Sequence, residues 1–404
     1  MVRIVIVGGS DAGIAAGLRA REVDSQAEVT VVVADAFPNY SICGLPFYVS
    51  GETPDWRQLA HRTVDELQTA GLDLLLDHTA TSIDPARHEV RIENRNGNAR
   101  AIAYDRLVIA TGAEPVRPSI SGLGLPGVFV LHTMDDSLRV HNALANGTVH
   151  EAVVVGTSYI GLEMADALTH RGVRVTLIGR AETVLPTVDP QLGQLVEDEL
   201  RRGGVDVIVG AEVEAVERDG SRLAVRAAGG VCAVADLVLV GAGVRPNSNL
   251  AASAGVETGI NGALRVDRQM RTNIPDIYAA GDCVETWQRV LDRYTYLPLG
   301  TTAHKQGRVA GENTVGGQRI FEGSVGTQVV KVFDLAVART GLRDKDAAIA
   351  GFDPLTIETE AWDHKAYYPG AHRLCLRVTG QHKDGTASGG ADCRALAGRS
   401  GQAD

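Results

Sequence analysis

Two stretches of the chain share the same order of apolar and small residues. The first, VRIVIVGGSDAGIAAGLRAR from Val2, passes from an apolar run through a glycine turn into an alanine-rich segment. The second, HEAVVVGTSYIGLEMADALTHRG from His150, repeats this order, and further apolar runs follow, EVTVVVAD and VRVTLIGR respectively. An apolar run, a turn, a helical segment and a second apolar run predict a βαβ unit with parallel strands. The chain is therefore predicted to be an α/β protein with two such units.

Both glycine turns resemble the loop that binds the pyrophosphate of a dinucleotide. The corresponding positions are Gly8, Ser10 and Gly13 in the first copy, and Gly156, Ser158 and Gly161 in the second. The first glycine of this loop allows the tight turn, and the last allows close packing of helix on strand. Serine occupies the middle position in both copies, so each copy is imperfect and one alone would also suit an ordinary α/β turn. Two copies favour two nucleotide sites.

Three later stretches fit this duplication. YDRLVIATGAEPVRP (104–118) and ADLVLVGAGVRPN (235–247) are apolar runs that end in small residues and then a proline. We interpret them as the exits of two nucleotide domains. TNIPDIYAAGDCVE (272–285) places Asp282 after a strand and a glycine, where a carboxylate can accept hydrogen bonds from ligand hydroxyls.

Charge and cysteine content restrict the partners. The formal net charge of −11 opposes a nucleic-acid partner or an anionic membrane surface. No apolar run is long enough to span a bilayer, and VRIVIVGG is interpreted as a buried strand rather than a signal peptide. Five widely spaced cysteines fit a reducing compartment and indicate neither a disulfide framework nor a metal site. A cytoplasmic protein is expected.

The order of these motifs resembles the flavin-dependent pyridine-nucleotide-disulfide oxidoreductases. Further matching stretches are YSICGLP, SYIGLE, AAGDC, AHKQGR, GTQVVKVFDLAVARTGL and YYPGA. Within the family the chain resembles the single-cysteine branch, which contains coenzyme A disulfide reductases, persulfide reductases, water-forming NADH oxidases and NADH peroxidases. The resemblance extends from residue 1 to about 378. The remaining residues have no apolar period, which is typical of a disordered or altered tail.

The resemblance implies three domains and two cofactors. An FAD domain comprises 1–112 and 241–313, an NAD(P) domain comprises 113–240, and a C-terminal α+β interface domain comprises 320–404, incomplete after about 378. Residues implied for FAD are Gly8, Gly9, Ser10, Gly13, Thr111, Gly112 and Asp282, and further cofactor-binding candidates are Asp11, Ala110, Gly243 and Gly281. Residues implied for the nicotinamide coenzyme are Gly156, Ser158, Tyr159, Ile160, Gly161, Glu163 and Arg180. Val33 replaces the glutamate that usually binds the adenosine ribose, so Asp35 is expected to serve.

Cys43 is the candidate redox centre. Dithiol members of the family carry a second cysteine three or five residues further on, whereas this chain has Pro46 and Tyr48 there. Cys43 is therefore expected to bond to an arriving group: a substrate thiol, a persulfide sulfur or an oxygen atom. A helix expected to start at Gly44 would favour the thiolate by ~1 kcal/mol, whereas lowering the pKa by ~2 units needs ~2.7 kcal/mol. A polar neighbour or the flavin must supply the rest.

Other positions favour a sulfur substrate over oxygen. Asp11 stands where oxidases and peroxidases of the branch carry a histidine, and a carboxylate beside a thiolate disfavours the anion. His304 matches a position where coenzyme A disulfide reductases can carry an acid/base histidine. The resemblance implies Arg19 and Asn39 as substrate-binding residues, with Glu22 at a position that is often basic. Tyr367 and Tyr368 match a loop that reaches the partner subunit's cysteine site in a homodimer and can donate to sulfur.

The expected activity is that of an FAD-dependent NAD(P)H:disulfide oxidoreductase, with coenzyme A disulfide as the favoured substrate and a persulfide as the other. The alternatives are an NADH oxidase or peroxidase using a sulfenic acid on Cys43, and a flavin-binding but inactive chain. Gly179 removes the acidic residue typical of NAD sites, and Arg180 can meet a 2′-phosphate, although Glu182 is close enough to compete. NADPH is therefore predicted over NADH, with NADH still possible.

Overall fold

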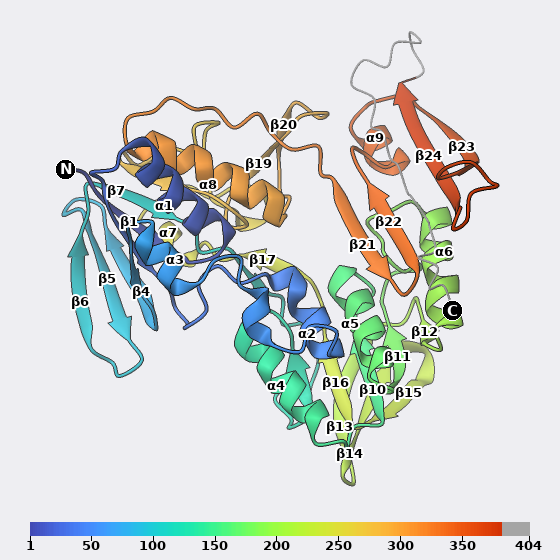
Figure 1. The fold of residues 1–404 in the computed structure, drawn as a ribbon. Coiled ribbons are helices and arrows are strands. Elements are labelled where there is room, and N and C mark those ends of the chain that lie inside the picture. Colours follow the sequence, from blue (N-terminus) through green and yellow to red (C-terminus); the bar gives the residue numbers. More distant parts are fainter. Residues whose placement is uncertain (382–404) are drawn as a thin grey trace. The chain divides into compact units, whose positions relative to one another are not determined.

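The computed structural model describes residues 1–381, which form two compact units (Figure 1). The first unit comprises Met1–Ser41, Arg57–Glu114 and Val244–Ser324. The second unit comprises Ile42–Trp56, Pro115–Gly243 and the described chain from Val325 onward. Each unit therefore combines segments that are distant in sequence.

A five-stranded parallel sheet forms the centre of the first unit. Its strand order is β18 (Ile277–Ala279), β7 (Arg106–Ile109), β1 (Arg3–Val7), β2 (Glu28–Val32) and β3 (Leu72–Leu75). Helices α1 (Asp11–Val23) and α8 (Gly300–Thr314) lie side by side (Figure 1). They approach closely because Gly307 and Gly311 face α1, where a Cβ would lie 2.2 Å from the Ala12 carbonyl oxygen and 2.0 Å from that of Ala16. The first predicted βαβ unit is confirmed.

The other elements of the first unit are short. They are the antiparallel strands β4 (His78–Asp84), β5 (Glu89–Asn94) and β6 (Ala99–Ala103), the pair β8 (Ala113–Pro115) and β17 (Val244–Pro246), the pair β19 (Thr286–Gln288) and β20 (Arg293–Thr295), and the helices α3 (Val64–Thr69) and α7 (Asn249–Ser253).

The second unit also has a five-stranded parallel sheet. Its order is β12 (Asp206–Ile208), β11 (Arg174–Ile178), β10 (Glu151–Val155), β16 (Leu237–Val240) and β9 (Val128–Val130). The strands β13 (Val213–Asp219), β14 (Arg222–Ala227) and β15 (Val231–Ala235) form a separate antiparallel sheet. Helix α5 (Tyr159–His170) connects β10 to β11, as the second predicted βαβ unit requires, and that prediction is also confirmed.

The remaining elements of this unit surround α5 and the C-terminal strands. They are the helices α2 (Leu45–Ser50), α4 (Met134–Ala145), α6 (Pro190–Arg202) and α9 (Asp344–Ile349), and the hairpins β21 (Gln328–Val332) with β22 (Leu335–Arg339) and β23 (Pro354–Trp362) with β24 (Arg373–Gln381). Helix α2 packs against α5 and α4, and β21 packs against α5 and α6. Within residues 1–381 no helix combines the length and hydropathy needed to cross a membrane.

The grouping differs from the predicted domain division in two respects. The segment with Cys43, Ile42–Trp56, belongs to the second unit rather than to the domain predicted for FAD. The strands after Val325 group with that second unit instead of standing alone. Both differences arise from packing, because α2 rests on α4 and α5, and β21 rests on α5 and α6. Which nucleotide each domain binds stays a prediction, and the tail predicted after 378 lies largely outside the described residues.

Candidate active site

The loop between β1 and α1 fits a pyrophosphate ligand. Gly8 has φ +120°, and a Cβ there would lie 2.0 Å from the Ala110 carbonyl oxygen. A Cβ on Gly13 would lie 1.9 Å from the carbonyl oxygen of Gly8. Ser10 is the N-cap of α1 and makes no side-chain capping hydrogen bond, so the first N–H groups of the helix are left for a ligand. The loop geometry therefore fits a pyrophosphate, and its binding of FAD stays a prediction.

Two carboxylates lie close to each other near this loop. Burial and the neighbouring charge of Asp11 raise the pKa of Asp282 to about 6. Burial also raises the pKa of Asp11, an effect that the nearby imidazoles of His61 and His304 oppose. Gly281, with φ +90°, allows this segment to approach α1, where a Cβ would lie 2.8 Å from that of Ala12. A ligand hydroxyl that donates to Asp282 would stabilise its charged form.

His61 is a member of this cluster that the sequence analysis missed. It follows the 3-10 turn that ends at Leu59, and its backbone N–H donates to the Asn39 carbonyl oxygen at 2.9 Å. The Asn39 N–H in turn donates to the Gly9 carbonyl oxygen at 2.7 Å. Asn39 is buried and has φ +58°, so it holds the loop in place. Its predicted role in substrate binding stays a prediction.

Val33, which replaces the glutamate that usually binds the adenosine ribose, directly follows β2. Val33 is buried and packs beside Gly9, where a Cβ would lie 2.6 Å from Val33 Cγ2. The Asp35 carboxylate accepts a hydrogen bond from the Phe37 N–H at 2.8 Å, so one of its oxygens has a partner within the chain. The other candidate positions of this edge are Ala110, Thr111 and Gly112, which follow β7 directly, and Thr111 Oγ1 donates to the Asn247 carbonyl. Asp35 as the ribose acceptor stays a prediction.

The second glycine loop has the same geometry. Gly156 has φ +116°, and a Cβ there would lie 2.3 Å from the Gly241 carbonyl oxygen, whereas one on Gly161 would lie 1.8 Å from that of Gly156. Ser158 is the N-cap of α5 without a side-chain capping bond. Tyr159 and Ile160 then begin the helix.

The Tyr159 ring is fixed within the second unit. Its hydroxyl bonds to the Gln328 side chain on β21 and accepts from Thr187 Oγ1 at 3.1 Å. Burial raises the pKa of the Tyr159 phenol, so the hydroxyl stays protonated. Its expected role as a lid over the flavin stays a prediction.

Cys43 lies in the 3-10 turn Ile42–Gly44 and is exposed. The helix expected at Gly44 is present, although Gly44 is its N-cap and α2 starts at Leu45. It ends at Ser50 because Gly51 takes a left-handed conformation with φ +89°. A helix of only six residues supplies a weaker dipole than a longer one, so other groups must contribute more to the thiolate.

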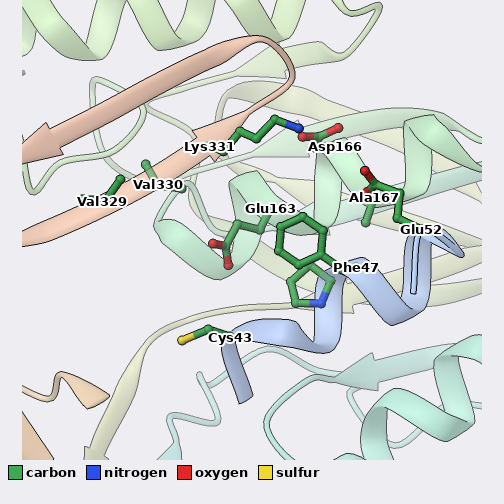
Figure 2. Close-up of a pocket in the computed structure, with 10 residues that line it drawn as sticks. Cys43, Phe47, Glu52, Glu163, Asp166, Ala167, Val329, Val330 and Lys331 are labelled. Carbon is green, nitrogen blue, oxygen red and sulfur yellow. The ribbon is translucent and has the colours of Figure 1, made fainter. Parts of the chain in front are cut away.

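Cys43 lines a cavity of about 220 Å³ inside the second unit (Figure 2). The wall comes from the turn before α2, from α2 and the residues after it, from α5 and from β21. It consists of Cys43, Pro46, Phe47, Glu52, Glu163, Asp166, Ala167, Val329, Val330 and Lys331. Burial, followed by the nearby charge of Asp166, raises the pKa of Glu163 to about 7. Glu163 can therefore hold or release a proton in the cavity that Cys43 lines. Its predicted role beside the nicotinamide stays a prediction.

Asp166, on the cavity wall, bonds to the hairpin of β21 and β22. Its carboxylate accepts from the Phe333 N–H at 2.8 Å, in the turn between β21 and β22. Burial raises the pKa of Asp166, while this hydrogen bond and then the Lys331 ammonium lower it. The helix that carries Glu163 is thereby tied to the strand on the other side of the cavity.

Glu163→Gln is expected to stabilise the protein at alkaline pH. A carboxyl whose pKa is raised on folding contributes stability below its unfolded pKa and loses it as pH rises through the folded value, here from about 4.5 to about 7. Urea unfolding should show a gain of roughly 1–3 kcal/mol at pH 8 and almost none at pH 4.5. The exposed Glu214 provides the control, because Glu214→Gln should change neither value. Equal gains at both pH values would contradict the assignment.

Three helices around Cys43 are joined by one arginine. Arg171, at the C-terminal end of α5, donates from Nε to the Val49 carbonyl on α2 at 2.8 Å and from a terminal nitrogen to His141 Nδ1 on α4 at 3.1 Å. The His141 ring stacks on Tyr48, with centroids 4.4 Å apart. Since arginine only donates, His141 Nδ1 must accept, and burial together with Arg171 lowers the pKa of the imidazole. The contact therefore requires neutral His141.

Arg171→Met is expected to loosen α2. Loss of the bond to Val49 should accelerate amide exchange in the Tyr48–Gly51 segment by about 10-fold, which corresponds to ~1.4 kcal/mol of local opening. Hydrogen exchange followed by mass spectrometry measures this. Arg174→Met is the matched control, because exposed Arg174 pairs with Glu151 instead. Equal exchange in both variants would show that Arg171 does not hold α2.

Arg19, predicted to bind substrate, has partners within the chain. The Arg19 guanidinium donates to Glu312 at 2.6 and 2.8 Å and pairs with Glu22 at 2.8 Å. A substrate phosphate would have to compete with these two carboxylates.

Tyr367 and Tyr368 lie in the turn between β23 and β24, exposed by 77% and 50%, with ring centroids 5.0 Å apart. Their exposure suits contact with a second molecule, and their role stays a prediction, as does the acid/base role of His304 on α8.

Arg180 follows β11 and is 80% exposed. The carboxylate that the structure places beside it is Glu212, at 3.4 Å, which corrects the expectation that Glu182 competes for the guanidinium. The reason is the turn after β12, where the Gly210 N–H donates to the Ala181 carbonyl after β11 and brings Glu212 to the end of that strand. Because the pair is exposed, it is weak and can open for a ligand phosphate. Gly243, with φ +96°, lies in the stretch 235–247 that was interpreted as the exit of a nucleotide domain.

The two glycine loops, the strand ends beside them and exposed Cys43 on the cavity wall are typical of an oxidoreductase that binds two dinucleotides. Residues 2–307 match the family model for pyridine nucleotide-disulphide oxidoreductases, and the chain belongs to this family. The predicted family, fold class and enzyme class are thereby confirmed. Use of a flavin and a pyridine nucleotide is confirmed at the level of the family.

The relatives come from the branch that the sequence resembles. The chain is 33% identical to the NAD(P)H sulfur oxidoreductase (CoA-dependent) of Pyrococcus furiosus, over 93% of this chain and 84% of that protein. It is 32% identical to the NADH oxidase of Methanocaldococcus jannaschii, again over 93% and 84%. The crystal structure of reduced Bacillus anthracis CoADR-RHD superposes with a TM-score of 0.94 at 29% identity, covering 98% of this chain and 71% of that one. The NAD-dependent persulfide reductase from A. fulgidus gives 0.90 at 36% identity, covering 94% and 72%.

Proposed function

We propose that this protein uses FAD and NADPH to reduce a low-molecular-weight disulfide or persulfide through Cys43, with a coenzyme A derivative as the favoured substrate. The observation that carries the proposal is the exposed Cys43 on the wall of a cavity that also contains Glu163. The CoA-dependent sulfur oxidoreductase of P. furiosus supports it, as does the coenzyme A disulfide reductase of Staphylococcus haemolyticus, which is 28% identical over 94% of this chain and 84% of that protein.

The cysteine chemistry consists of two exchanges at sulfur. The Cys43 thiolate attacks one sulfur of the substrate, forms a mixed disulfide and breaks the substrate S–S bond, and the second sulfur leaves as a thiolate that takes up a proton. Glu163, with its pKa raised to about 7, can supply that proton near neutral pH. Two electrons and one further proton then release the bound thiol and restore the Cys43 thiolate. The sum is one disulfide, one NADPH and one proton giving two thiols and NADP⁺.

The first unit would hold the flavin. The uncapped start of α1 and the close approach of Gly8 to Ala110 fit its pyrophosphate, and buried Asp282 fits a hydroxyl donor. When bound, FAD accepts a hydride from the nicotinamide and transfers an electron pair to sulfur. The chain itself supplies the orientation, the buried acceptor and the thiolate. A homodimer and a cytoplasmic location are part of the proposal, supported by exposed Tyr367 and by the low cysteine content.

The preference for NADPH depends on the end of β11. Gly179 provides no carboxylate to repel a 2′-phosphate, and Arg180 is exposed beside it. A charge-assisted contact of Arg180 with that phosphate would contribute ~1.5–3 kcal/mol, or roughly 10- to 150-fold in affinity. The exposed Glu212 reduces this gain only slightly, because a surface pair contributes little.

The second candidate is an NADH oxidase, which the M. jannaschii relative favours by its name. Asp11 opposes it, because a carboxylate cannot take the role of the imidazole that oxidases of this branch carry there. One batch of enzyme assayed with coenzyme A disulfide, coenzyme A persulfide, glutathione disulfide, peroxide and oxygen separates the two. The proposal expects a coenzyme A substrate to give the highest kcat/KM. Faster NAD(P)H oxidation with oxygen alone would favour the oxidase, and failure of every oxidant with flavin bound would indicate an inactive chain.

A further inference from the structure

One contact between glycine loop and strand end has opposite residue sizes in the two units. In the first unit Gly9 of the loop faces Val33, which follows β2, and a Cβ on Gly9 would lie 2.6 Å from Val33 Cγ2. In the second unit the loop residue is Thr157 and the strand-end residue is Gly179, where a Cβ would lie 2.3 Å from Thr157 Cγ2. The strand register makes these positions equivalent, because Val7 pairs with Val32 as Val155 pairs with Ile178.

The backbone of Thr157 is held beside this contact. Its side chain is buried, and its carbonyl oxygen accepts from the Leu185 N–H at 2.8 Å, which fixes the backbone beside the strand end. A Cβ on Gly179 would also lie 2.7 Å from Thr157 Oγ1 and 3.0 Å from Thr157 Cβ. Because the position of Thr157 Cβ does not depend on χ1, rotating the side chain leaves part of this contact in place. The Gly179 N–H itself donates to the Ile208 carbonyl at 2.9 Å, which holds the strand end against β12. The backbone of each partner is therefore held by a hydrogen bond.

We infer that Thr157 and Gly179 form a size-complementary pair that determines the nicotinamide coenzyme: Thr157 occupies the space into which an acidic side chain at 179 would extend. The inference rests on the proposed use of NADPH. An acidic residue after the second strand accepts both ribose hydroxyls of an NAD-type coenzyme and repels a 2′-phosphate. With Thr157 in place such a residue cannot be accommodated, so the site is restricted to recognition by Arg180, which lies next to Gly179 and is exposed. Thr157 is thus a specificity-determining residue although it carries no charge.

A double-mutant cycle on the FAD-loaded enzyme tests this pair. The variants are Thr157→Gly, Gly179→Glu and the combination of both, with thermal unfolding as a measure of folding. Calorimetric binding of adenosine 2′,5′-bisphosphate and of 5′-AMP reports ribose recognition without turnover, and kcat/KM for NADPH and NADH reports it during catalysis. The Gly179→Glu variant alone should lower the midpoint of unfolding and weaken the binding of both nucleotides by at least about 10-fold. The combination should restore the midpoint of unfolding, and it should raise the ratio of kcat/KM for NADH to kcat/KM for NADPH by at least about 100-fold.

The outcomes separate this inference from the proposed function. The pairing would be overturned if the effects were additive, that is, if Gly179→Glu alone were as stable and changed coenzyme preference as much as the combination. This outcome would leave the NADPH preference of the wild type intact. A wild-type enzyme that prefers NADH would refute the proposed preference, whereas rescue of the Gly179→Glu variant by Thr157→Gly would still support the pairing. If Gly179→Glu alone does not fold, recovery of folded protein in the combination is itself the predicted rescue. Thr157→Val keeps the volume and should not rescue; rescue by valine would contradict the steric explanation.

Discussion

Cys43→Ser is expected to lower disulfide-dependent turnover by about 1000-fold or more. A serine hydroxyl at this position is almost entirely protonated at neutral pH, and it cannot form or exchange a disulfide. Bound flavin and its reduction by NADPH should persist, because Cys43 lies in a short exposed turn outside the first unit. Steady-state assays with coenzyme A disulfide, together with anaerobic flavin bleaching by NADPH, measure the two effects separately.

A second exposed cysteine provides the matched control. Cys232 lies on β15 and is exposed like Cys43, but it lines no part of the cavity formed by α2, α5 and β21. Cys232→Ser should therefore retain full turnover. Undiminished turnover in Cys43→Ser would refute the role of Cys43, and a comparable loss in both variants would point to a general effect of thiol removal.

Gly13→Ala is expected to damage the first unit severely. The new Cβ would lie 1.9 Å from the Gly8 carbonyl oxygen, which is backbone and cannot rotate away. Helix α1 must then move off the loop, at a cost of about 3 kcal/mol, and its first N–H groups move with it. The measurable consequences are a fall in the thermal midpoint and in the flavin bound per mole of purified protein.

Gly17→Ala on the same helix is the matched control. Its Cβ would lie 3.0 Å from Leu72 Cδ2, the flexible end of a side chain that can adjust. The gain in helix propensity is up to ~1 kcal/mol and offsets the crowding, so stability and flavin content should stay near wild type. Equal losses in the two variants would show that any methyl group on α1 is harmful and that the approach to Gly8 has no special role.

The two βαβ units and their glycine loops were predictable because their requirements are local. A buried parallel strand needs a run of apolar residues, and a turn at φ +120° or +116° needs Gly8 or Gly156 within one residue of its end. Cys43 was also identified from a short segment, because Pro46 and Tyr48 occupy the positions where a second, pairing cysteine would stand. Family and fold class therefore follow from short segments, and so does the prediction that Cys43 is the redox centre.

The environment of each group depended on contacts between distant segments. Glu163 shares a cavity with Cys43, 120 positions earlier in the chain, because α2 packs on α5. His61 lies near Asp11 through the backbone bonds of Asn39, and no motif marks it. Sequence spacing likewise suggested Glu182 as the partner of Arg180, whereas the turn after β12 supplies Glu212.

The chain thus encodes its class in apolar periods and turn glycines, which act over a few residues and can be read in order. Other features arise only in the folded protein. They are the raised pKa of Glu163, the hydrogen bond from Arg171 to Val49 on α2 and the contact of Thr157 with Gly179. Burial, charge and steric overlap depend on which side chains become neighbours in space, and the folded core brings together residues that sequence order keeps apart.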